Sequence, residues 1–207
     1  MADLMSWHLT DMPDEFVDII IRDVAKFDVH QKNSTVMDDN GGLDKVVRNS
    51  TNAWIPTAHW LGGWLWYYID KVNRENFRYD LTDIDGGNIQ YTQYAEGQYY
   101  NWHQDQDIDN FYKPQFTPGS GTNTAQDDVM IGGEYVRKLS FVLQLSHPDE
   151  YRGGELQFLD NSGGTFFAPK QRGTFILFDS RTRHRVRKVK SGLRKSLVGW
   201  VVGPRWR

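Results

Sequence analysis

The chain has 207 residues, enough for one domain with a substantial core, and its net charge of -3 at pH 7 gives no general attraction to nucleic-acid backbones. It contains no cysteine, which excludes disulfides and thiolate metal sites, so any metal must be held by histidine and carboxylate side chains. No stretch approaches the roughly 20 apolar residues of a membrane span, and the first residues lack the apolar centre of a signal peptide, so we expect a cytoplasmic protein without a membrane partner.

Two amphipathic helices are predicted in the first 80 residues. Residues 13–27 begin with a proline and two acids, which is a helix-start signal, and then place apolar residues three and four positions apart. Residues 58–72 carry a broad apolar face despite Gly62 and Gly63. The stretch 33–43, rich in Asn, Asp and Gly, is predicted to be a loop. We therefore expect residues 1–80 to form a helical support that packs on a sheet.

From residue 88 onward the pattern changes to short β-rich runs separated by turns. The predicted strands are 88–95, 99–105, 139–145, 155–159, 174–178, 183–189 and 194–202. Short strands that recur after a helical part predict a mainly β fold, with helices on one side of a β-sandwich or jelly roll. We predict a single domain over residues 1–207 with its β core at 88–203. The long polar segment 106–134 is a candidate lid because such connections in compact domains are often functional.

Three side chains are candidate metal ligands. His103 and Asp105 are two residues apart on a predicted strand, so they share one face with Asn101. His184 lies where arginines occupy every second position from 181 to 187, which sends the arginines to solvent and the histidine inward. Two imidazoles and one carboxylate, with coordination positions left open, suit non-haem Fe(II) in oxygen-using enzymes. For a bare His-x-Asp motif, a hydrogen-bonded structural pair is the alternative.

A second His-x-Asp motif, at His147 and Asp149, is rejected as a ligand pair. Pro148 and the glycines at 153 and 154 place it in a turn, where side chains are not held on one inward face. The other three histidines have no carboxylate two residues later and are expected to be structural or exposed: His8, His30 and His59.

The predicted strand 194–202 places Arg194 and Ser196 on one face with Val198 and Trp200. An exposed edge charge is the alternative for an isolated arginine, but these apolar neighbours indicate that Arg194 points inward. A buried guanidinium needs an anion, and an arginine beside a serine can grip a carboxylate. A dicarboxylate cosubstrate would supply that anion.

Residues 88–203 resemble the Fe(II)- and 2-oxoglutarate-dependent dioxygenases, specifically the prolyl 4-hydroxylase-like branch. The resemblance is carried by three linked pieces in order: Tyr94-x-x-Gly97-x-x-Tyr100-x-x-His103-x-Asp105; Leu139 to Leu145 followed by Tyr151-x-Gly153-Gly154-Glu155-Leu156-x-Phe158; and Gly173 to Phe178, Ser180, His184-x-Val186, Gly192-x-Arg194-x-Ser196 and Trp200. The stretch from Ser146 to Leu156 is most similar to bacterial and phage hydroxylases. Many collagen-type relatives have lysine where this chain has Arg194, which argues against a collagen-modifying role.

The resemblance implies a double-stranded β-helix in which His103, Asp105 and His184 bind Fe(II) and act in catalysis. It implies that Arg194 binds the distal carboxylate of 2-oxoglutarate, with Tyr94 and Ser196 as hydrogen-bonding helpers. Tyr100 lies off the ligand-facing parity of its predicted strand. The implied reaction consumes 2-oxoglutarate and O2, releases succinate and CO2, and hydroxylates a C–H bond. Ascorbate is a further cofactor that the family suggests.

The expected substrate is a prolyl residue in a peptide or protein. One alternative is an oxygenase acting on a free amino acid, another small molecule or a nucleobase, and a second is a non-catalytic β-helix binding module. The basic run from Arg181 to Lys190 could attract an acidic partner, but its period of two also fits a solvated outer strand face. Nucleic acid is not favoured as a partner.

Overall fold

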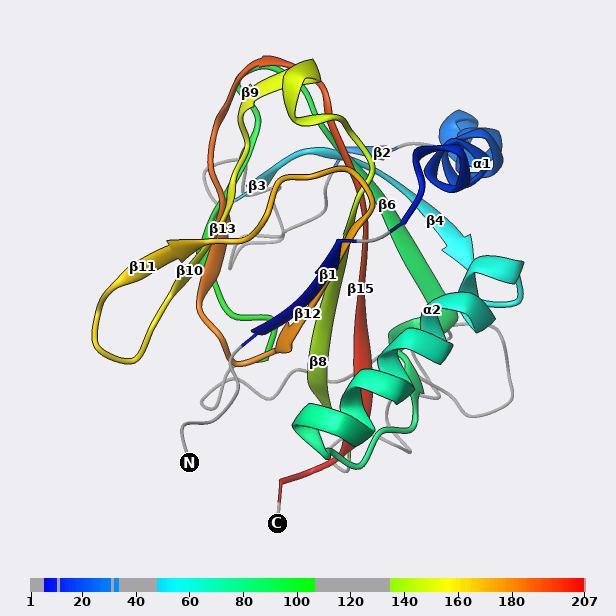
Figure 1. Cartoon of the computed structure of the whole chain (residues 1–207), viewed down its shortest axis with the longest axis vertical. Coiled ribbons are helices and arrows are strands. Elements are labelled where there is room, and N and C mark those ends of the chain that lie inside the picture. The colour runs from blue at the N-terminus through cyan, green and yellow to red at the C-terminus, as the bar shows by residue number, and fades with distance from the viewer. Residues whose placement is uncertain (1–5, 11, 31, 34–47, 107–134, 207) are drawn as a thin grey trace, which may run out of the picture.

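The computed structural model describes residues 6–10, 12–30, 32–33, 48–106 and 135–206. Within these ranges the fold has three layers: two helices, a large antiparallel sheet and a smaller antiparallel sheet (Figure 1). The α-helices are α1 (Asp14–Val24) and α2 (Trp60–Val72), and short helical turns are η1 (Ala25–His30), η2 (Asn73–Phe77), η3 (Asp85–Gly87) and η4 (Pro148–Glu150). No helix in the described ranges is both long and apolar enough to cross a membrane.

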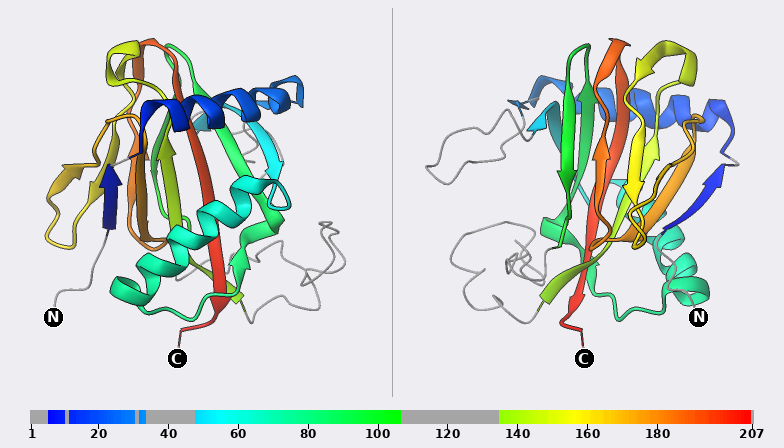
Figure 2. Two further views of the ribbon diagram at one scale, coloured as in Figure 1. Left: turned by 45° about the vertical axis from the view of Figure 1, so that its right-hand side comes forward. Right: turned by 90° about the vertical axis from the view of Figure 1, so that its left-hand side faces the viewer.

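The large sheet is built from strands at both ends of the chain. Its members are β1 (Ser6–Thr10), β2 (Lys32–Asn33), β4 (Thr51–Pro56), β5 (Asp83–Ile84), β6 (Asn88–Tyr94), β8 (Tyr135–Gln144), β12 (Thr174–Asp179) and β15 (Arg194–Pro204). They run in the order β1-β12-β8-β15-β6-β4-β2, with β5 beside β15. Both helices lie on the outer face of this sheet, and α2 runs obliquely across the strands (Figure 2).

The small sheet faces the large one on the side away from the helices (Figure 2). It consists of β3 (Arg48–Asn49), β7 (Tyr99–His103), β10 (Leu156–Leu159), β11 (Thr165–Phe167) and β13 (His184–Val186), in the order β11-β10-β13-β7-β3. A separate two-stranded ribbon pairs β9 (Tyr151–Gly153) with β14 (Val189–Gly192). The mainly β, jelly-roll architecture with helices on one side is therefore confirmed.

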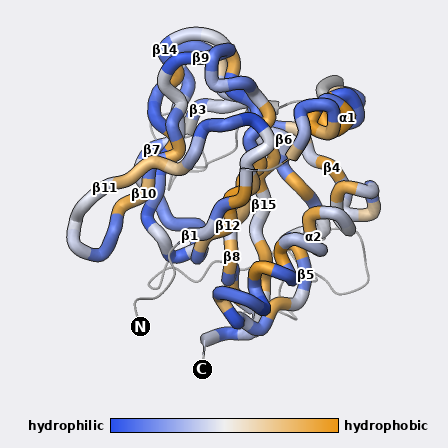
Figure 3. The backbone as a smooth tube through the Cα atoms, in the orientation of Figure 1, coloured by the Kyte–Doolittle hydropathy of each residue, from blue (hydrophilic) through white to orange (hydrophobic). Residues whose placement is uncertain are grey.

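Strand alternation divides the buried side chains into two groups. On β8, Leu139, Phe141 and Leu143 face the helices and join the main hydrophobic core with residues of α1 and α2. The intervening Val142 faces the small sheet and belongs to a second cluster between the sheets. Figure 3 shows the hydrophobic stretches of β8, β12 and α2 where these layers meet. Because successive side chains point to opposite faces, one strand can serve both a helix-packing core and an inner cavity.

The predicted helices and strands are present, with shifted ends. The first helix ends at Val24 and continues as η1, while β8 begins at Tyr135 rather than 139. Residues 1–80 were expected to be helical, but they also contribute β1 and β4 to the large sheet. The predicted loop 33–43 beyond residue 33 and the candidate lid beyond residue 106 lie outside the described residues. The assignment of residues 1–207 to one domain stays a prediction.

Two adjacent glycines in α2 allow a matched test of helix packing. A Cβ at Gly62 would lie 2.0 Å from the backbone oxygen of Thr57, whereas a Cβ at Gly63 would meet no atom of a described residue within 4 Å. We expect Gly62→Ala to lower the free energy of unfolding by about 1–3 kcal/mol, because backbone atoms cannot move aside cheaply. Gly63→Ala should raise it by about 0.5–1 kcal/mol through helix propensity. Urea unfolding of both variants measures the difference, and equal effects would contradict this account.

Candidate active site

The two histidines lie side by side on neighbouring strands of the small sheet. His103 on β7 is directly opposite His184 on β13, and their ring centroids are 4.2 Å apart. Each ring is held by the backbone carbonyl two residues earlier: His103 Nδ1 lies 2.7 Å from the oxygen of Asn101, and His184 Nδ1 lies 2.9 Å from the oxygen of Thr182. A carbonyl can only accept, so in the neutral rings Nδ1 carries the hydrogen and Nε2 keeps its lone pair.

A β-bulge in β7 corrects the predicted strand faces. Pairing shifts between His103 opposite His184 and Tyr100 opposite Val186, so three steps on β7 match two on β13. As a result Asn101 is exposed on the outer side instead of sharing the inner face with His103. Tyr100, which regular alternation placed off the ligand face, stacks on the His103 ring with centroids 3.5 Å apart. The bulge also provides the carbonyl that orients His103.

Asp105 lies just beyond the end of β7 and completes the cluster. Its Oδ1 is 3.6 Å from His103 Nε2, and its Oδ2 is 3.5 Å from His184 Nε2. The backbone N–H groups of Asp105 and Gln106 both donate to the oxygen of Ser180, each at 3.0 Å. Donor atoms bonded to one metal ion at about 2.1 Å lie roughly 3–4 Å apart, so this arrangement fits a shared ion after a small adjustment.

The charge states of the cluster also fit metal ligands. Burial opposes ionisation of Asp105, but the electrostatic attraction of the adjacent imidazoles of His184 and His103, and of Arg137, outweighs it and holds the pKa of Asp105 well below its usual range. Burial, together with the neighbouring His103, lowers the pKa of His184 to about 4 against the pull of Asp105. Near pH 7 the site therefore offers an ionised carboxylate and a neutral His184 ring whose Nε2 can bind a cation.

A serine behind Asp105 should support metal binding. Ser140 Oγ on β8 donates to Asp105 Oδ2 at 2.7 Å and lies 2.9 Å from the hydroxyl of Ser180. We expect Ser140→Ala to weaken Mn(II) or Fe(II) affinity by about 10- to 100-fold, because groups that orient metal ligands commonly contribute that much. Anaerobic titration calorimetry measures the change. Ser146→Ala is the matched control, since this buried serine also makes two hydrogen bonds, to the backbone of Leu193 and Lys195; an equal loss in the control would contradict the assignment.

Arg194 lies in the same cavity as the histidine cluster. The cavity is lined by Gln90, Tyr94, Tyr100, His103, Asp105, Val142, Leu156, Phe178, His184, Val186, Arg194, Val198 and Trp200. Arg194 is 1% exposed and donates to Gln144 Oε1 at 2.9 Å and to Ser196 Oγ at 3.3 Å, while its Nε has no hydrogen-bond partner among the residues that the structure describes. No carboxylate of the described residues forms an ion pair with it. Pairing of β6 with β15 sets Tyr94 opposite Arg194, with the guanidinium carbon 5.6 Å from the ring centroid.

The structure thus brings together all six predicted site residues and adds three that the motifs did not single out. Ser140 donates a hydrogen bond to Asp105, and Gln144 accepts one from Arg194. Gln90 lines the cavity. The sequence of 139–145 could have indicated Ser140 and Gln144, because they are polar residues at even positions of an otherwise apolar strand and so share one face. The second His-x-Asp lies outside this cluster: the side chain of His147 is 48% exposed and pairs with Asp14 on α1.

Comparison with known proteins identifies the family of the chain. The sequence profile of the 2OG-Fe(II) oxygenase superfamily matches residues 89–202. A PKHD-type hydroxylase of Colwellia psychrerythraea is 31% identical over 195 residues, which cover 93% of this chain and 77% of that protein. The chain belongs to the 2OG-Fe(II) oxygenase superfamily, whose members use Fe(II) and 2-oxoglutarate.

Other relatives match over a shorter range. A PKHD-type hydroxylase of Parvibaculum lavamentivorans is 37% identical over 87 residues, which cover 42% of this chain and 39% of that protein. Among solved structures, a prolyl hydroxylase of Trichoplax adhaerens, in complex with a peptide fragment of the hypoxia inducible factor oxygen degradation domain, has a TM-score of 0.68 at 15% identity, covering 95% of this chain and 82% of that one. This structural likeness concerns the fold.

Proposed function

We propose that the protein is an Fe(II)- and 2-oxoglutarate-dependent dioxygenase that hydroxylates a prolyl residue in a peptide or protein. The observation that carries the proposal is one cavity that holds a His-Asp-His cluster and a buried guanidinium to which no described carboxylate is paired. The cluster supplies ligands for a cation, and the guanidinium supplies a counter-charge for an anion. A metal together with a dicarboxylate satisfies both.

The metal would be held by His103, Asp105 and His184. Their donor set of two nitrogens and one carboxylate leaves coordination positions open, which suits Fe(II) in oxygen-using enzymes. When bound, Fe(II) activates O2 together with 2-oxoglutarate for insertion of oxygen into a C–H bond. The protein contributes orientation: the carbonyls of Asn101 and Thr182 fix the imidazole rings, and Ser140 holds the carboxylate.

The distal carboxylate of 2-oxoglutarate would pair with Arg194. Gln144 and Ser196 accept hydrogen bonds from its two terminal nitrogens and so fix the plane of the guanidinium. Its Nε, which has no partner within the described part of the chain, leaves a donor for the incoming anion. Tyr94 packs beside it, and apolar walls formed by Val142, Leu156 and Val198 exclude water from the cavity.

The proposal of a prolyl substrate is supported by the proteins to which the chain is similar. Two relatives are named PKHD-type hydroxylases, and a structural neighbour is a prolyl hydroxylase that holds a peptide. A free amino acid, another small molecule or a nucleobase is the alternative for the same chemistry. A non-catalytic binding module is not favoured, because the ligand cluster and the Arg/Ser pair are both complete. Stimulation by ascorbate and a cytoplasmic location stay predictions.

The test is turnover of 2-oxoglutarate by the Fe(II)-loaded protein. Succinate formed with and without proline-containing peptides is measured, and the peptides are examined by mass spectrometry for a gain of one oxygen. Stimulated succinate formation together with oxygen on a prolyl residue supports the proposal. Oxygen transfer to amino acids or nucleobases but to no peptide would refute the prolyl substrate and favour the alternative substrate class. Metal binding without succinate formation under any condition would favour the non-catalytic binding module.

A further inference from the structure

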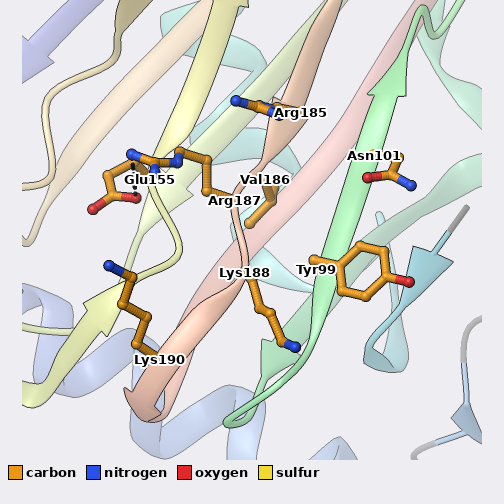
Figure 4. A pocket seen from close by; sticks show the side chains of 8 residues that line it. All are labelled: Tyr99, Asn101, Glu155, Arg185, Val186, Arg187, Lys188 and Lys190. Carbon is orange, nitrogen blue, oxygen red and sulfur yellow. Dashed lines mark ion pairs between the residues drawn. The ribbon is translucent and has the colours of Figure 1, made fainter. Parts of the chain in front are cut away.

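The outer face of the small sheet carries a hollow of about 430 Å³ that is separate from the histidine cavity (Figure 4). Its lining residues are Tyr99, Asn101, Glu155, Arg185, Val186, Arg187, Lys188 and Lys190. Four of them are cations and one is a carboxylate, although the whole chain carries a net charge of -3. The hollow therefore carries a local excess of positive charge on a chain whose net charge is negative.

Two of the four cations are held in place by the sheet. Arg185 Nε donates to Gln157 Oε1 at 2.8 Å, and its guanidinium lies 4.6 Å from the ring centroid of Trp102. Arg187 lies over Phe167, 5.7 Å from the ring centroid, and 3.7 Å from Glu155. Long side chains on a merely solvated face would keep their rotamer freedom. Because Arg185 and Arg187 are already ordered, less side-chain conformational entropy is lost when a partner binds.

The other two cations are not neutralised by the described residues. Lys188 and Lys190 are exposed, and no described carboxylate forms an ion pair with either. Figure 4 shows the side chains of Lys188 and Lys190 extending in different directions. The cations do not converge on one point, so a single small anion cannot contact them all. Arg185 and Arg187, and likewise Lys188 and Lys190, are two residues apart, and residues at that spacing in an extended chain lie about 7 Å apart, which matches alternate side chains of an extended peptide.

An acidic peptide is the occupant that fits both the charge of the hollow and the proposed function, in which the substrate is a peptide or protein. Carboxylates need only the guanidinium and ammonium groups that line the hollow. The net charge of -3 gives the chain no general attraction to a nucleic-acid backbone. The aromatic rings do not decide the occupant, because Trp102 lies under Arg185 whereas Phe167 is 50% exposed, so binding of an oligothymidylate is compared directly in the test.

We propose that this hollow binds an extended acidic peptide segment, and that protein substrates carry such a segment outside the residue that is hydroxylated. The second part rests on the proposed function. The hollow and the histidine cavity occupy opposite faces of β13, because Arg185 points outward while His184 points inward, and Val186 lines both. A substrate held at the hollow would therefore be kept close to the reacting centre.

Binding is tested first without turnover. Fluorescence anisotropy compares labelled peptides of alternating glutamate and serine, or lysine and serine, with an oligothymidylate of equal length. We expect binding of the acidic peptide that weakens as salt rises, and a loss of about tenfold or more in Lys188→Glu/Lys190→Glu through lost attraction and new repulsion. Arg22→Glu/Lys71→Glu makes the same change of net charge on α1 and α2 and should alter affinity by less than about twofold.

Three results would overturn the proposal: no binding of the acidic peptide at low salt, an equal loss in the helix control, or tighter binding of the oligothymidylate. In turnover assays, an acidic extension on a peptide substrate should lower KM in the wild type but not in Lys188→Glu/Lys190→Glu, with kcat unchanged. Binding without turnover of any substrate would refute the proposed function and leave the docking site in place. Turnover with no effect of the extension would refute the link between the two.

Discussion

Replacing His184 by alanine should abolish both Fe(II) binding and 2-oxoglutarate turnover. The site offers three donors, and His184 supplies one of its two imidazole nitrogens, in a ring fixed by the carbonyl of Thr182 at 2.9 Å. Loss of groups that only orient ligands costs about 10- to 100-fold in metal affinity, so loss of a ligand should cost at least about 100-fold. Anaerobic titration with Fe(II) or Mn(II) measures the affinity, and succinate formation measures turnover.

The chain contains a matched control for this change. His147 also belongs to a His-x-Asp motif, but its side chain is 48% exposed and lies at η4, where it pairs with Asp14. We expect His147→Ala to keep metal affinity and turnover. Alanine at His103 or Asp105 should behave like His184→Ala, because all three donors belong to one cluster. Retained turnover in His184→Ala, with the protein folded, would refute the metal-site assignment.

Replacing Arg194 by methionine should separate function from stability. A buried guanidinium without a paired carboxylate is costly to the fold, and exchange of buried charge for an apolar chain of similar length is often neutral or stabilising by about 1–4 kcal/mol. The same change removes the counter-charge proposed for 2-oxoglutarate, and loss of one partner of a buried charge pair costs about 2–5 kcal/mol. We expect a KM for 2-oxoglutarate raised by about 100-fold or more, with a Tm that is unchanged or higher.

Arg172 provides a control for which the opposite effects on stability and cosubstrate binding are expected. Its side chain is 10% exposed, but it pairs with Asp14 and Asp18 of α1 and donates to the carbonyl of Leu145 at 3.1 Å. Arg172→Met should therefore lower the Tm and leave the KM for 2-oxoglutarate unchanged. The KM of Arg194→Lys for 2-oxoglutarate should lie between the values of the wild type and Arg194→Met, because lysine keeps the charge but cannot form the bidentate hydrogen bonds of a guanidinium. A lowered Tm with unchanged KM in Arg194→Met would show that Arg194 is structural.

Most residues of the candidate site could be predicted from the sequence to lie on inward strand faces, because the alternation of apolar and polar residues on their strands is clear. The arginines at every second position around His184 indicated its inward side, and the apolar neighbours of Arg194 indicated burial; both residues are buried. Strands β1 and β4 escaped prediction because each is short and lies within a part of the chain that is dominated by helical patterns. Their pairing with β12 and β6 depends on partners far away in the sequence.

The amino-acid sequence specifies which chemical groups the protein possesses and on which strands they lie, since side-chain type and the period of two are local properties. Convergence of these groups on one cavity depends on the tertiary structure. Antiparallel pairing of β7 with β13 places His103 opposite His184, a bulge turns Tyr100 inward, and β8 brings Ser140 to Asp105 from the other sheet. Distances between donor atoms are set by strand register and sheet packing, which join residues that are remote along the chain.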